Sequence, residues 1–298
     1  MFYRIDEYQP NGYALAYGNR LVHHSLGKRM VKCLVMLIFS GLAALTSLPV
    51  QADPTNVEQI MLNSDYSTVK LLAKDLYGAL TPSQRNLIDG DIVVLQKEVM
   101  PYVRPGEFSA DARPKLVVVV SEGFVDLVNN LSYAAANNLF QKGCLEKYVC
   151  TLAQEAGDKK LTGFPALSQR DLWSLRITNE QLTRFNQMAG TLVAIDMAHH
   201  YLGHYKKYKS QLIGKNGASV PINSVISLSE WNDALMAGAK NALECSLGVD
   251  GIKSFFECIN KMPQRPLWTE YFLLPKANVR KVNSQLTRLE KSYFAQRK

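Results

Sequence analysis

Residues 195–204 read IDMAHHYLGH and lie in the longest stretch with helical patterning, predicted to run from residue 178 to about residue 212. All histidines that follow residue 53 fall within this decapeptide. On an ideal helix, at about 100° per residue, Asp196, His200 and His204 form one stripe at i, i+4 and i+8. Neighbouring members of such a stripe converge and could share a metal ion. The stripe marks the candidate site; the alternative is that Asp196 only caps or pairs with a histidine on a polar face.

A strand and several further helices surround this stretch. Residues 115–120 read KLVVVV, a β-branched run between Pro114 and Gly123 that is typical of a strand. Apolar residues at helical spacing predict further helices over 55–79, 81–100, 124–140, 229–245, 248–261 and 276–296. We therefore predict an α+β fold, a mostly helical single domain with a small sheet.

Length and composition restrict the class of protein. The chain has 298 residues, of which 47% are hydrophobic and 20% charged, as expected for a folded globular protein with a sizeable core. The formal net charge is +8, a surplus that is too diluted along the chain to favour nucleic acid. Nucleic acid is therefore not an expected partner.

The N-terminal region is typical of a bacterial-type signal peptide. A basic segment at 28–32 precedes the apolar run Cys33–Leu45, and Ala52 ends a small-residue cleavage site. The run is too short to span a bilayer, so no retained transmembrane helix is expected, while membrane association stays open. We predict cleavage after Ala52 and a periplasmic or secreted protein, with Met1 or Met30 as the translation start. The predicted domains are 1–52, an N-terminal extension and signal peptide, and 53–298, the folded domain.

The cysteines give a second indication of the compartment. After residue 52 they form two local pairs, Cys144 with Cys150 and Cys245 with Cys258. An even number of cysteines in local pairs is typical of an oxidising compartment, so we predict both disulfides. The alternative is four reduced thiols, since neither spacing fits a structural zinc site.

The decapeptide resembles the HExxHxxxxH stretch of the gluzincin metallopeptidases, the family that includes the CAAX prenyl proteases and the bacterial heat-shock membrane protease. In this alignment Ile195 takes the place of the first histidine and Asp196 that of the glutamate. His199 takes the place of the second histidine, and His204 that of a later one. The resemblance implies a gluzincin-like fold, with His199 as a zinc ligand.

Further segments follow the family pattern over roughly residues 115–290. Residues 229–234, SEWNDA, resemble the ExxAD helix of the family, which implies that Glu230 is the third zinc ligand. The strand at 115–120 resembles the family's edge strand, along which a peptide binds by β-addition. This similarity implies a substrate-binding role for Val117, Val118, Val119 and Val120.

Two residues differ from the family motif, Ile195 and Asp196, and these differences lead to two hypotheses about function. Isoleucine at position 195 cannot bind a metal, whereas catalytic zinc needs three protein ligands. Aspartate at 196 is one methylene shorter than the glutamate that serves as general base. The first hypothesis is a non-catalytic or weakly active factor of the cell envelope that binds a peptide or protein, without a cofactor. The alternative is an active zinc peptidase with a rearranged site drawn from Asp196, His199, His200, His204 and Glu230.

Overall fold

The computed structural model describes residues 54–88, 93–109, 114–164, 175–214 and 217–297. These residues belong to one compact unit, Asp53–Lys298. The predicted signal peptide and its cleavage after Ala52 lie outside the described residues. Over the described ranges, no helix combines the length and the apolar character needed to cross a bilayer.

The unit is mostly helical and contains a small sheet, as predicted from the sequence. Its α-helices are α1 (Pro54–Ala79), α2 (Pro82–Arg85), α3 (Glu122–Asn138), α4 (Cys144–Leu152), α5 (Leu175–Tyr201), α6 (His204–Tyr208), α7 (Leu228–Glu244), α8 (Asp250–Lys261) and α9 (Val279–Ala295). Short 3₁₀ helices are η3 (Lys209–Gln211), η4 (Ile222–Ser224) and η5 (Leu267–Tyr271). The strands are β1 (Val93–Gln96), β2 (Val103–Phe108) and β3 (Lys115–Ser121).

The sheet has the order β1-β3-β2, so the predicted strand is central and not an edge. β1 pairs with β3 in parallel, with Val93 opposite Val118, and β2 pairs with it antiparallel, with Val103 opposite Val120. A peptide therefore finds no free edge at β3, whose residues Val117–Val120 are buried. The prediction of an edge strand there is wrong because the sequence analysis missed both flanking strands.

The segment 81–100 was expected to be one helix, and this expectation is wrong. Thr81 does cap α2 in a capping box with Gln84, and Pro82 is its first residue, as the sequence indicates. The helix ends at Arg85, however, and Val93 begins β1. Valines favour a pleated surface, and pairing with β3 outweighs the weak helical pattern.

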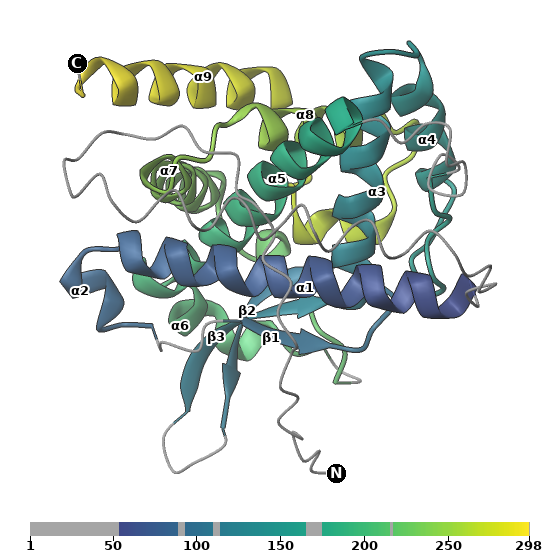
Figure 1. The fold of residues 1–298 in the computed structure, drawn as a ribbon. Coiled ribbons are helices and arrows are strands. Elements are labelled where there is room, and N and C mark those ends of the chain that lie inside the picture. Colours follow the sequence, from purple (N-terminus) through teal and green to yellow (C-terminus); the bar gives the residue numbers. More distant parts are fainter. Residues whose placement is uncertain (1–53, 89–92, 110–113, 165–174, 215–216, 298) are drawn as a thin grey trace, which may run out of the picture. The chain divides into compact units, whose positions relative to one another are not determined.

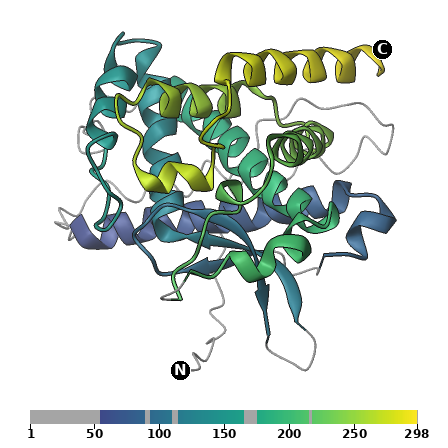
Figure 2. The ribbon, with the colours of Figure 1, turned by 180° about the vertical axis from the view of Figure 1, so that it is seen from behind.

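Helix α5 forms the centre of the unit, and Figures 1 and 2 show it between α3 and α7. It also packs against α1, α8 and β2. Its middle turns are fully buried, with Val193, Ala194 and Ala198 inaccessible to solvent. Because α5 contacts both helical and sheet layers, it can carry side chains toward each of them.

Neither predicted disulfide is present, since all four cysteines of the described chain are free thiols. Cys144 and Cys150 both lie on α4. Six residues of helix separate their Cα atoms by about 9 Å along the axis, and a disulfide needs less than about 7 Å. Cys245 caps α7, whereas Cys258 is buried eight residues into α8, about 12 Å along that helix from its start. Cysteines that are close in the sequence do not pair here, because the helices between them hold their Cα atoms too far apart.

Helices α5 and α7 approach each other closely at Gly238. A Cβ atom added to Gly238 would lie 2.6 Å from the backbone nitrogen of Ile195 and 2.7 Å from its Cα atom. Both atoms belong to backbone, so neither can rotate away. The absence of a side chain at Gly238 therefore sets the distance between the two helices.

We predict that Gly238→Ala lowers the free energy of unfolding by about 1–3 kcal/mol, because the added methyl group forces the two backbones apart. Urea denaturation measures this change. Gly78→Ala on the exposed end of α1 is the matched control, since its Cβ would meet nothing within 4 Å. The control should be neutral or stabilising by up to about 1 kcal/mol. Equal effects of the two substitutions would contradict the close contact.

Candidate functional site

The candidate site begins where α5 ends, earlier than the sequence predicts. The helix stops at Tyr201, and Gly203 adopts a left-handed conformation with φ of 81° before α6 begins at His204. Glycine accepts this conformation without the strain that a Cβ atom causes. The predicted stripe of Asp196, His200 and His204 is therefore not formed, because the turn redirects His204.

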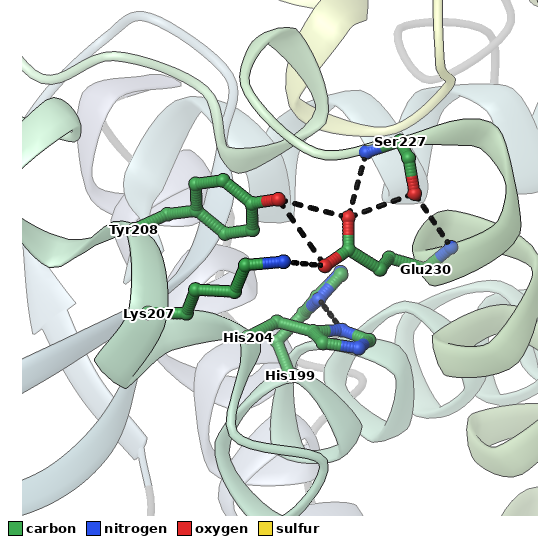
Figure 3. A network of polar contacts seen from close by, with 6 residues as sticks. All are labelled: His199, His204, Lys207, Tyr208, Ser227 and Glu230. Carbon is green, nitrogen blue, oxygen red and sulfur yellow. Dashed lines mark hydrogen bonds and ion pairs between the residues drawn. The ribbon is translucent and has the colours of Figure 1, made fainter.

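His204 instead meets His199. Their Nδ1 atoms are 3.1 Å apart and their ring centroids 5.3 Å apart, so one imidazole donates a hydrogen bond and the other accepts it (Figure 3). Both side chains are buried. Burial lowers the pKa of His199 to about 3 and lowers that of His204 below its usual value. The pair is thus neutral near pH 7.

His200 points to the sheet. Its Nε2 atom donates a hydrogen bond of 2.8 Å to the carbonyl oxygen of Val117, and its ring packs edge-on against Tyr205. The Nδ1 atom is buried without a hydrogen-bond partner among the described residues. Burial lowers the pKa of His200 to about 4, and the bond to Val117 opposes this only in part. This histidine therefore fastens α5 to β3.

Glu230 lies in the first turn of α7 and faces the histidine pair (Figure 3). Its carboxylate accepts hydrogen bonds from the backbone and hydroxyl of Ser227, which completes a capping box. It also accepts one from Lys207 Nζ at 2.7 Å and from the Tyr208 hydroxyl at 3.0 Å. The bond from Lys207 is the main cause that lowers the pKa of Glu230 to about 2. The carboxylate is thus ionised and held on several sides.

Asp196 and Ile195 lie away from this cluster. Asp196 is 4% exposed, and burial raises its pKa well above the usual value, opposed only in part by the positive charge of Arg104. A protonated carboxyl can donate a hydrogen bond, whereas a general base must be ionised. Ile195 is buried at the contact with Gly238.

The structure brings together His199, His204 and Glu230 among the residues predicted for a metal site. It places His200 at the sheet and leaves Asp196 in a separate buried position. In the ranges the structure describes, no three His, Cys, Asp or Glu side chains are arranged to hold a metal ion. The possible metal ligands are the imidazoles of His199 and His204 and the carboxylate of Glu230, which accepts a hydrogen bond from Lys207. These residues do not fit a three-ligand catalytic zinc site.

Two groups of functional interest escaped the sequence analysis. Lys207 and Tyr208 follow α5 in the sequence and resemble an ordinary solvated helix end, yet both bind Glu230. Arg104 lies in β2, a strand that the sequence analysis did not predict. Pro105 and Gly106 next to it are typical of an edge strand, and this was the only local signal.

We predict that Glu230→Ala lowers the free energy of unfolding by about 1–2 kcal/mol, because it removes the ion pair and the carboxylate half of the capping box, while Ser227 still caps the helix. Glu230→Gln keeps the capping box and should cost less than about 1 kcal/mol. The folded-state pKa of Glu230 is depressed, so its charge stabilises the protein above about pH 4.5, and this stabilisation is lost as the pH falls toward 2. Thermal unfolding from pH 7 to pH 2 should therefore show the difference between Glu230→Gln and wild type vanish. A difference that grows in acid would contradict this assignment.

Comparisons with models of protein families, with curated proteins and with solved structures found no match to this chain. The chemistry of the site is therefore judged from its geometry alone. That geometry is a neutral imidazole pair beside a capped carboxylate, with a separate buried aspartic acid.

Proposed function

We propose that this protein is a non-catalytic factor of the cell envelope that binds an extended peptide or protein segment on a metallopeptidase-like scaffold. The observation that carries this proposal is that Glu230, the residue aligned with the third zinc ligand, binds neighbouring side chains instead. Its oxygens are engaged by Ser227, Lys207 and Tyr208. Ile195, aligned with the first ligand, contributes only to the contact between α5 and α7.

The peptide would add to β2, one of the two edge strands, β1 and β2, of the described sheet. Ser121 donates its backbone N–H to the carbonyl of Tyr102, so the backbone groups of Tyr102 face β3. Successive residues of a strand direct their backbone N–H and C=O groups to opposite sides. The backbone groups of Val103 and Glu107 therefore point to the free side of β2. Such groups are a template for an added strand.

The outer end of β2 is its accessible part. Val103 is 1% exposed, whereas Glu107 is partly exposed and Phe108 is 39% exposed. Pro105 lacks an N–H group and limits pairing at its own position. Glu107 with its outward backbone and Phe108 as an apolar contact thus define where the peptide begins to bind. Export to the envelope is the part of the proposal that depends on the N-terminal sequence.

The experiment measures binding of a displayed library of linear peptides to wild-type protein, Glu107→Pro and Glu107→Gln. Proline at 107 removes the outward N–H donor, so we expect at least about a tenfold loss, the effect of one hydrogen bond at a buried interface. Glutamine keeps the N–H group and removes only the ion pair with Lys209, so binding should stay within about threefold. Circular dichroism checks that both variants are folded. Equal peptide recovery by Glu107→Pro and wild type, or no recovery by wild type, would refute the proposal.

One observation favours a second candidate function, a metal-dependent peptidase. The 3.1 Å separation of the Nδ1 atoms of His199 and His204 is close to the roughly 3.4 Å between two ligands of a tetrahedral zinc ion. Neutral imidazoles are the form that binds metal. A third ligand would have to come from a side chain that is otherwise engaged, such as Glu230, once Lys207 has moved.

Elemental analysis of purified protein separates the two candidates. The binding function predicts less than about 0.2 zinc per chain, because two imidazoles alone hold zinc weakly. The peptidase predicts about one zinc per chain, lost in His204→Ala and retained in His200→Ala, whose nitrogen binds the Val117 carbonyl instead. Stoichiometric zinc with that pattern would replace the first candidate by the second.

A further inference from the structure

Arg104 is a half-buried cation without an anionic partner among the residues that the structure describes. Its Nη2 atom donates one long hydrogen bond of 3.4 Å to Oε1 of Gln96. Its Nε atom is buried and has no partner. A guanidinium carries five N–H donors, and buried donors are normally satisfied. Most of the donor capacity of Arg104 is therefore unused.

The side chains in direct contact with the guanidinium of Arg104, Gln96 and Tyr102, are uncharged. The guanidinium carbon lies 5.5 Å from the centroid of the Tyr102 ring, a cation–π contact, and Tyr102 in turn packs against Tyr271. The charge of Arg104 also acts on the hydroxyl group of Tyr205. This aromatic wall orients the guanidinium without compensating its charge.

The guanidinium lies near Gln96 of β1 and the Tyr102 ring, toward the start of β2. A Cβ atom at Gly106 would lie 3.6 Å from Arg104 Nη1, an ordinary van der Waals distance, so the guanidinium also borders Gly106. Gly106 immediately precedes Glu107, where the outward backbone becomes accessible. Arg104 thus belongs to the strand whose free edge is the place proposed for the peptide, and its guanidinium borders Gly106, the neighbour of Glu107.

The acidic side chains near this end of β2 do not neutralise Arg104. Glu107 pairs with Lys209 at 2.6 Å and Glu230 pairs with Lys207 at 2.7 Å. Arg104 forms neither an ion pair nor a hydrogen bond with Asp196 across the interface between β2 and α5. The positive charge of Arg104 is therefore available to a ligand. The paired N–H groups of a guanidinium match the two oxygens of a carboxylate.

We propose that Arg104 anchors a carboxylate of the bound peptide, supplied by its carboxyl terminus or by an acidic side chain. This inference rests on the proposed peptide-binding function and narrows its ligands to acidic ones. Arg104 contacts the ligand directly, while Tyr102 and Gln96 position its guanidinium. An amide in place of the carboxylate keeps the shape of the ligand and loses the charge.

Biolayer interferometry with three pools of biotinylated pentapeptides tests the proposal. The first pool lacks Asp and Glu and has free carboxyl termini; the second is the same pool with amidated termini; the third is amidated and carries one fixed Glu. We expect wild type to bind the first or third pool about 10- to 100-fold more tightly than the second, the effect of a charge-assisted hydrogen bond. The pool that binds identifies the source of the carboxylate.

Variants then assign the effect to one residue. Arg104→Gln should abolish the preference among the pools, whereas Arg280→Gln on the surface of α9 should leave the preference intact. The comparison among pools needs no variant, so it decides the matter even where Arg104→Gln fails to fold. Equal binding of all three pools, blocked by Glu107→Pro, would overturn the carboxylate anchor and leave the peptide-binding function standing. Absence of binding to every pool would overturn both.

Discussion

The contact of Gly238 with the backbone of Ile195 is the constraint on which the site depends. It brings α7 against α5 at a distance that no other residue allows. Glu230 lies eight residues before Gly238, about two turns away, and His199 lies about one turn beyond Ile195. The close contact between α5 and α7 thus places the N-terminal end of α7 next to the histidine pair. It also places position 195 in the tightest part of the interface, where an apolar side chain fits.

The turn at Gly203 divides the histidines into two structural roles. A continued helix would place His204 on the face that His200 presents to the sheet. The left-handed glycine ends α5 and directs His204 to His199 instead. His200 then serves as a link from α5 to β3, and the other two form a neutral pair beside α7. Three histidines within six residues of the sequence therefore do not form one chemical group.

The sequence predicted the elements whose local pattern is strong and missed those that depend on distant partners. β3 is a run of valines and α7 begins with a capping box, and both were predicted close to their observed bounds. β1 has only four residues and β2 contains Pro105, so each is stabilised by pairing with β3 and not by its own pattern. Without those two strands, the central position of β3 and the free edge of β2 could not be predicted. The histidine cluster was found, but its pairing required the turn at Gly203.

The strength of the contacts around the site differs between its floor and its rim. The floor is held by the buried bond from His200 to β3 and by the capping box of α7, which are costly to break. The rim is the short segment after α5, tied to α7 by Lys207 and to β2 by Lys209. The two lysine side chains are 61% and 52% exposed, and such ion pairs contribute only about 0–1 kcal/mol each. A ligand at the proposed site on the edge of β2 would therefore displace the rim at low free-energy cost, while the floor would keep its geometry.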